Sequence, residues 1–279
     1  MSSTVLGLVR ASHPEPTAAV TVVAALLAAG VGHSNGGLAV VALTVAASQF
    51  AVGWTNDLLD ADRDAMVGRT DKPVAAGAVG RRTVAVAAVL AAAATVTLAL
   101  TTNPVAALWA VTGLLSALLY DWPLKSTPIS VLPYAISFGA LPAFVVSALP
   151  GAPPPPAWLV AAAALLGAGA HFANVLPDLA DDARTGVHGL PHRLGPTGSR
   201  LAATGLLIAA TVTLVLGPPG PPSGVGLAVA GTAVVILALA WRSGRRADRA
   251  GSRPVTAFRA AMLVAMIDVV LLVASGRLV

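Results

Sequence analysis

The chain of 279 residues contains no cysteine. Disulfide bonds, thiolate metal sites and cysteine nucleophiles are therefore excluded. Charged residues are also scarce: they make up 10% of the chain, whereas a soluble domain carries about 25%. Because 56% of the residues are hydrophobic, this shortage of charge predicts an all-α integral membrane protein with little mass outside the bilayer.

We expect no cleavable signal peptide. Residues 1–16 contain Arg10, His13 and Glu15, and no long apolar segment with a cleavage site precedes the first apolar run. We expect these residues to form an N-terminal tail in the cytoplasm. The formal net charge of +5 does not indicate nucleic-acid binding, because the basic residues stand beside apolar runs, as they do in membrane proteins.

Nine apolar runs reach the length of roughly 17–25 residues that a helix needs to cross a bilayer. Nine crossings place the two termini on opposite sides of the membrane. All but Arg277 of the 17 basic residues then fall on one side, which the positive-inside rule identifies as cytoplasmic. We expect a single domain over residues 1–279, with a central cavity that opens toward the cytoplasm of a bacterial cell. The nine runs are residues 17–33, 37–58, 82–101, 104–120, 129–149, 157–177, 201–217, 224–241 and 257–275.

The acidic residues number only 12, and four aspartates stand close together in residues 56–64, directly after an apolar run. Asn56, Asp60 and Asp64 are four residues apart. On a helix they share one face and span about 12 Å of its axis, at about 1.5 Å per residue. A line of oxygen ligands of this kind suits a hard cation.

Residues 174–182 repeat this pattern, since Asn174, Asp178 and Asp182 have the same spacing. The two segments follow the second and the sixth apolar runs, so they face the same side of the membrane. One acidic segment would be a solvated helix end in most proteins. Two at matched spacing, in a chain so poor in acids, predict a shared metal site.

The predicted metal site indicates the substrate class. Mg²⁺ is usually held by one or two carboxylates together with substrate phosphates, so two carboxylate clusters predict a polyanionic substrate. Nearby basic residues can bind the remaining phosphate oxygens by charge-assisted hydrogen bonds. The surrounding helices are apolar, which predicts a hydrocarbon tail, and a prenyl diphosphate meets both demands. The basic residues are Arg63, Arg69, Lys72, Lys125 and Arg184.

Together these features resemble the UbiA superfamily of intramembrane prenyltransferases, which have nine transmembrane helices and two aspartate-rich cytoplasmic motifs. Asn56–Asp64 matches the first motif, N-D-x-x-D-x-x-x-D, and Asp178–Asp182 matches the second, D-x-x-x-D. Residues 69–77 look like the basic loop of the family. Residues 120–125 look like its Tyr-Ser-x-x-Leu-Lys segment, with Asp121 where the family often has Ser.

The resemblance implies Mg²⁺-dependent cleavage of a prenyl diphosphate and transfer of the prenyl group to an aromatic or other lipophilic acceptor. It implies that Lys72 and Lys125 bind the diphosphate. The catalytic residues that it implies are Asp60, Asp64, Asp178 and Asp182. We expect Asp57, Asn174 and Asp181 to contact the metal ligands without binding the metal themselves. The implied metal ligands are Asn56, Asp60, Asp64, Asp178 and Asp182.

Two other functions use some of the same features. A terpene cyclase on this fold would need the same aspartates and no acceptor, and it is favoured weakly because only Arg10 and His13 offer a cation for an acceptor carboxylate. A cation or polyanion transporter would place ionisable residues near the bilayer midplane, whereas here the acids gather at one surface. The exception is Asp268, which lies inside the last apolar run and is either functional or simply hydrogen-bonded.

Three further side chains near the motifs have two interpretations each. Tyr134 and Phe138 are four residues apart, so they share a helix face and could shield a carbocation with their π-faces. Ordinary packing is the favoured interpretation of this pair. His171 could flank the metal, but it is more typical of a hydrogen bond between helices.

Overall fold

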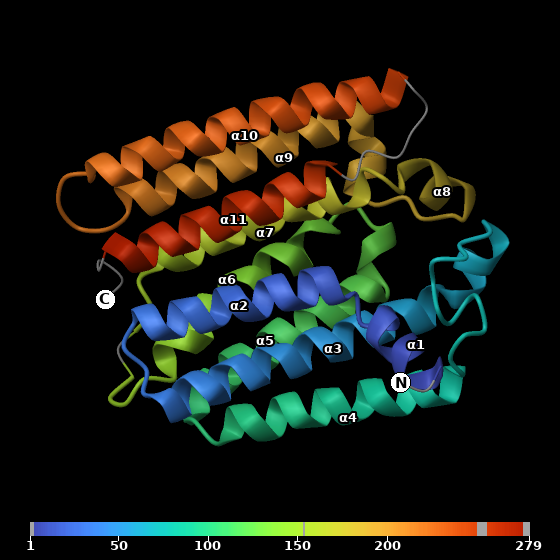
Figure 1. Ribbon diagram of the computed structural model, residues 1–279, viewed down its shortest axis with the longest axis horizontal. Helices are drawn as coiled ribbons and strands as arrows, with labels where there is room; N and C mark the ends of the chain where they lie inside the picture. Colours follow the sequence, from blue (N-terminus) through green and yellow to red (C-terminus); the bar gives the residue numbers. More distant parts are fainter. Residues whose placement is uncertain (1–2, 153, 250–255, 276–279) are drawn as a thin grey trace.

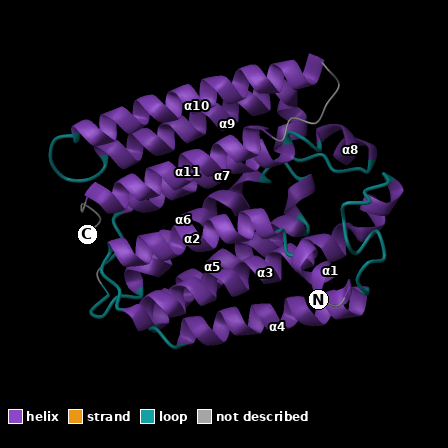
Figure 2. Cartoon of the chain, viewed as in Figure 1, coloured by secondary structure: helices purple, strands orange, loops and turns teal. Residues whose placement is uncertain are grey.

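The computed structural model describes residues 3–152, 154–249 and 256–275, and in these ranges the chain forms helices and no strand (Figures 1 and 2). The long helices run side by side as one bundle. The elements in chain order are α1 (Ser3–Ala11), α2 (Pro14–Gly30), α3 (Asn35–Met66), α4 (Arg81–Leu100), α5 (Pro104–Asp121), the 3₁₀ turn η1 (Leu124–Ser126), α6 (Val131–Ser147), α7 (Ala157–Val175), α8 (Leu179–Arg184), α9 (Leu190–Leu216), α10 (Gly224–Arg249) and α11 (Thr256–Ser275).

The apolar runs explain the long helices. Each of the nine predicted ranges contains one helix, from α2 to α7 and from α9 to α11. Within the described parts of the chain, six helices are long and apolar enough to cross a membrane, and α2 and α6 are shorter apolar helices. The chain is therefore an integral, multi-pass membrane protein, while the number of nine crossings and the central cavity remain predictions.

Three boundaries differ from the prediction, each for a local reason. The predicted N-terminal tail contains a helix, α1, which is too short to be recognised as a membrane span. Helix α3 continues to Met66 rather than ending at residue 58, because good helix formers alternate with the aspartates there: Leu59, Ala61, Arg63, Ala65 and Met66. Helix α9 begins at Leu190, before the predicted start at residue 201, and it kinks at Gly195. Gly195 has a φ of 67° and is followed by Pro196, which has no N–H to continue the helix.

Consecutive long helices pack against one another, and α11 packs against α2, α7, α9 and α10, so it joins the beginning of the chain to its end. Helix α1, residues 67–80 and α8 all lie at one end of the bundle, on the right of Figure 1. We call this the motif end. The opposite end is filled by buried apolar side chains from six helices: Ala24, Leu27, Ala28, Val41, Val45, Ala106, Phe144, Val145, Val146, Leu159 and Leu272.

Candidate active site

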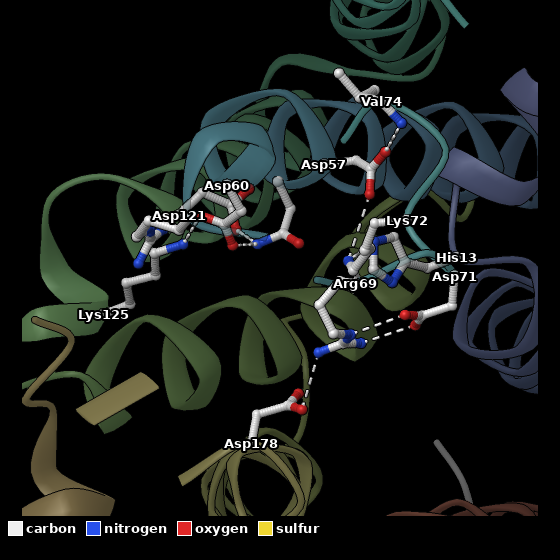
Figure 3. Close-up of polar contacts among 12 residues, drawn as sticks. His13, Asp57, Asp60, Arg69, Asp71, Lys72, Val74, Asp121, Lys125 and Asp178 are labelled. Atoms are coloured by element: carbon white, nitrogen blue, oxygen red, sulfur yellow. Dashed lines mark hydrogen bonds and ion pairs between the residues drawn. The ribbon is translucent and has the colours of Figure 1, made fainter. Parts of the chain in front are cut away.

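The first motif lies on the last turns of α3, so its three predicted ligands share one face of a continuous helix. The Asp60 carboxylate contacts the side chains of Arg63, on the next turn, and Lys125, in η1 (Figure 3). The Asn56 amide nitrogen donates to Asp60 Oδ2 at 3.2 Å. Two predicted diphosphate ligands therefore converge on one motif aspartate.

Asp57 points away from this face and fixes the loop that follows α3. Its side chain is 1% exposed, and its Oδ2 accepts a hydrogen bond from the Val74 backbone N–H at 3.2 Å. Its Oδ1 lies 3.4 Å from Lys72 Nζ. The Lys72 ammonium also donates to His13 Nε2 at 3.2 Å (Figure 3). Asp57 and His13 thus hold the predicted diphosphate-binding lysine between them.

The position of His13 could not be predicted from the sequence, because the residue lies far from Lys72 along the chain. Burial, followed by the positive charge of the neighbouring Lys72 ammonium, lowers the pKa of His13 to about 3. The imidazole is therefore neutral at physiological pH, and in this state its unprotonated nitrogen can accept a hydrogen bond from an ammonium. His13 acts here as a hydrogen-bond acceptor and carries no charge.

The second motif does not repeat the backbone of the first. Helix α7 ends at Val175, and Asp178 is the N-cap of the separate helix α8. Pro177 explains the break, since proline has no N–H to continue the helix. Asn174 consequently does not lie on one helical face with Asp178. Its amide donates to the Tyr134 hydroxyl at 3.1 Å instead, so the matched spacing of the two segments does not give Asn174 the geometry of Asn56.

Arg69 connects the two motifs. Its Nε and Nη2 donate to the two carboxylate oxygens of Asp71, both at 2.9 Å, and its Nη1 donates to Asp178 Oδ1 at 3.1 Å (Figure 3). The hydrogen bonds from Arg69 lower the pKa of Asp71 to about 2. Since Arg69 follows the first motif and Asp178 opens the second, the fold brings the two segments within the reach of one side chain.

Asp182 and Asp181 lie on different sides of α8. The Asp182 carboxylate lies 3.7 Å from His192 Nε2. Burial, followed by repulsion from Asp178, raises the pKa of Asp182 to about 6. Asp181 contacts Arg184, whose side chain is 68% exposed. The predicted diphosphate ligand Arg184 is thus engaged on its own helix and directed toward solvent.

The donor atoms fit Mg²⁺, although the side chains are not gathered around a single point. Among the described residues, no three His, Asp or Glu side chains are grouped closely enough to hold a metal ion. The carboxylates of Asp60 and Asp178 are instead paired with cationic side chains. All the motif donors are hard oxygens, as Mg²⁺ prefers. One of them, Asp64 Oδ2, is buried and has no hydrogen-bond partner in the part of the chain that the structure describes.

An aromatic cluster lies beside the motifs. The rings of Tyr120 and Tyr134 meet edge to face at 4.8 Å, and Phe138 stacks on Tyr134 at 6.2 Å. His171, 1% exposed, lies 5.0 Å from the Tyr134 ring and shares a hydrogen bond of 3.1 Å with Ser130 Oγ. The hydrogen bond between α7 and the start of α6 is the simpler of the two interpretations of His171.

Comparison with known proteins decides the family. The profile of the UbiA prenyltransferase family matches residues 17–267 of the chain. The chain belongs to this family. No curated protein matches this UbiA family member.

Solved structures of other UbiA proteins share the fold. A UbiA homologue from Aeropyrum pernix K1, in its apo form, has a TM-score of 0.73 and 22% identity over 94% of this chain and 96% of that one. A UbiA homologue from Archaeoglobus fulgidus bound to GPP and Mg²⁺ has a TM-score of 0.73 and 17% identity over 97% and 98%. A digeranylgeranylglyceryl phosphate synthase has a TM-score of 0.67 and 17% identity over 100% and 99%. At these identities the likeness establishes the UbiA fold and not the substrate.

Proposed function

We propose that this UbiA family member is a Mg²⁺-dependent prenyltransferase, which ionises a prenyl diphosphate at the motif end and transfers the prenyl group to a lipophilic acceptor. The observation that carries the proposal is the bridge from Arg69 to Asp178 at 3.1 Å. It supports one site built from both motifs, since each motif alone would be an ordinary charged helix end.

The basic side chains near this bridge support a phosphate-bearing substrate. Lys125 and Arg63 contact Asp60, and Arg69 contacts Asp178. A diphosphate bound through Mg²⁺ would compete for these cations, which would turn from the carboxylates to the phosphate oxygens. The structures of the Archaeoglobus fulgidus homologue with GPP and Mg²⁺ and with DMAPP and Mg²⁺ support the same pairing of ligand and metal.

The residues would divide the work of ionisation. Bound Mg²⁺ would neutralise charge on the departing diphosphate. The proposed metal ligands are Asn56, Asp60, Asp64, Asp178 and Asp182. Lys125 and Arg63 would donate to oxygens of the leaving group, whose charge grows as the bond to carbon breaks. Burial lowers the pKa of Lys125, with Arg63 as the second cause, so the approach of an anion stabilises its charged form.

The prenyl group would occupy the space beside the aromatic cluster. Tyr120, Tyr134 and Phe138 present aromatic rings there, and such rings attract a cation through their π-faces. An allylic cation formed among them would be kept from water until the acceptor attacks it. By the positive-inside rule, we place the motif end, and with it the N-terminus, in the cytoplasm.

A terpene cyclase is the second candidate, and His13 favours it. Two side chains, His13 and Arg10, were candidates to bind an acceptor carboxylate. His13 is neutral and hydrogen-bonded to Lys72, so it offers no positive charge. Arg10 is exposed at the surface. The site therefore offers poor recognition of a benzoate-type acceptor. An uncharged lipid acceptor, or no acceptor at all, fits the site better.

The test uses the purified full-length protein in detergent or lipid, with Mg²⁺ and prenyl diphosphates of five to twenty carbons, with and without aromatic and lipid acceptors. Diphosphate release is measured and the organic products are extracted. Release that requires an acceptor supports transfer, whereas release with a terpene product and no acceptor supports cyclisation. A reaction in which Mg²⁺ is removed by a chelator serves as the blank. Diphosphate release no greater than this blank, for every chain length, would refute both functions.

A further inference from the structure

Asp121 is a buried carboxylate beside the first motif that neither motif includes. It is the last residue of α5, and its side chain is 3% exposed. Its Oδ1 accepts a hydrogen bond from Asn56 Nδ2 at 3.1 Å (Figure 3). Its Oδ2 is buried and has no hydrogen-bond partner among the described residues. The contact joins α5 to α3 across a long stretch of sequence.

The location of Asp121 is unfavourable for a carboxylate in two ways. The carboxyl end of a helix carries partial negative charge, which repels an acid. Burial removes the water that would otherwise solvate the charge. An aspartate in such a place needs a compensating interaction, and the amide of Asn56 supplies one. The Lys125 ammonium also attracts the Asp121 carboxylate, so Asn56 and Lys125 together compensate for its burial.

The contact fixes the orientation of the Asn56 amide. The Nδ2 group has two hydrogens; one is donated to Asp60 Oδ2 at 3.2 Å and the other to Asp121 Oδ1 at 3.1 Å. Each carboxylate offers an acceptor oxygen to one of these hydrogens, so the two contacts turn the amide nitrogen toward both acids. Its oxygen then points the other way, and an amide oxygen is a suitable ligand for a hard cation. Asp60 alone, on the same helix, would leave the second hydrogen without a fixed partner.

We propose that Asp121 is a positioning residue that holds Asn56 with its amide oxygen presented to the metal. The proposal rests on the proposed function, since it takes Asn56 as a Mg²⁺ ligand. Asp121 acts through its acceptor oxygen rather than through its charge. Residues that orient a metal ligand typically change metal affinity or activity about 10- to 100-fold when they are removed.

The test measures metal binding apart from turnover. The full-length protein in detergent is titrated with Mg²⁺ at a fixed concentration of inorganic diphosphate, and the rise in unfolding temperature gives the half-saturating Mg²⁺ concentration. The Mg²⁺ concentration for half-maximal cleavage of a prenyl diphosphate is measured in parallel. Asp62→Ala is the matched control. Asp62 lies on α3 near Asn56, but its side chain is 80% exposed and is paired with Arg81.

We expect Asp121→Ala to raise the half-saturating Mg²⁺ concentration about tenfold or more. Asp121→Asn keeps an acceptor oxygen at the same reach and should stay within about threefold of the wild type, and Asp62→Ala should be unchanged. In an Asn56→Ala background, Asp121→Ala should have no further effect, because the two residues act as one unit. If Asp121→Ala does not fold, Asp121→Leu replaces it, since an apolar side chain of similar size leaves no buried charge.

Three results would overturn the proposal: Asp121→Ala or Asp121→Leu titrating like the wild type, Asp121→Asn being as weak as Asp121→Ala, or additive effects of the Asn56 and Asp121 substitutions. The proposed function fails separately. If the wild type binds Mg²⁺ with inorganic diphosphate but cleaves no prenyl diphosphate, the positioning role is decided by the temperature titration alone.

Discussion

Lys125 allows the sharpest test of how the proposed site promotes ionisation. Its side chain is 11% exposed and contacts Asp60, so the ammonium acts where water screens charges weakly. Substitution Lys125→Met removes the ammonium and keeps a side chain of similar length. Asp60 retains its contact with Arg63, so its carboxylate keeps a cationic partner and the fold should persist.

The expected loss follows from the strength of the interaction. A hydrogen bond to a charged group contributes about 1.5–3 kcal/mol, which corresponds to about 10- to 150-fold in rate at 1.36 kcal/mol for each factor of ten. The diphosphate gains charge as it departs, so the ammonium stabilises the transition state more than the bound substrate. The loss should therefore appear in kcat, with KM changing by less than about threefold.

The assay is steady-state diphosphate release at saturating Mg²⁺, with Arg81→Met as the control. Arg81 lies at the same end of the molecule and pairs with Asp62, but both side chains are more than half exposed, so its charge is screened by solvent. Arg81→Met should keep the wild-type kcat. If Lys125→Met differs from Arg81→Met by less than about twofold in kcat, leaving-group stabilisation by Lys125 is refuted.

Three further predictions concern the motifs and the bundle. Asp60→Asn and Asp178→Asn should each abolish diphosphate release and leave the unfolding temperature within a few degrees of the wild type, because each removes a ligand of one shared site. Since Asp182 has a pKa of about 6, above its ordinary value, it takes up a proton as the pH falls; the half-saturating Mg²⁺ concentration should rise about tenfold between pH 7 and pH 5. Thr211 donates to the buried Asp268 at 2.9 Å, so Thr211→Val should lower stability by about 1–3 kcal/mol without changing turnover.

Each of these predictions has a contrary outcome. A near-normal rate in either single motif variant would contradict the shared site. A half-saturating Mg²⁺ concentration that does not change with pH would mean that Asp182 is not a ligand. If the concentration does change, the variant Asp182→Asn should show a weaker dependence on pH than the wild type. Unchanged unfolding in detergent for Thr211→Val would show that its hydrogen bond to Asp268 adds nothing to the native state.

The sequence was sufficient for most of the fold because membrane helices depend on long apolar runs, which can be recognised directly. Gly217 and Pro104, for instance, stand at a helix end and a helix start that composition already indicates. Helix α1 was missed because nine residues are too few to show a clear apolar period. Pro177 indicates that the helix is interrupted before the second motif. The matched spacing of the aspartates suggests a continuous helix instead, so spacing alone does not reveal the break.

The candidate site was only partly predictable. The two motifs and their basic neighbours could be found by spacing and charge. Contacts between distant segments, such as Lys72 with His13 or Asn56 with Asp121, depend on how the helices pack, and no local pattern specifies them. A buried acid at the carboxyl end of a helix was the one sequence signal that could have drawn attention to Asp121.

The break at Pro177 gives the two halves of the site different mechanical properties. Helix α3 has 32 residues, about 48 Å at 1.5 Å per residue, and it packs against α2, α4 and α5. Helix α8 has only six residues and is followed by Gly186, whose φ is 83°. Rotations about a few bonds beside α8 can change the distance between the motifs, whereas moving the first motif would bend a packed helix. The first motif is thus the fixed reference of the site, and the second is the part that can follow a ligand whose shape and charge change.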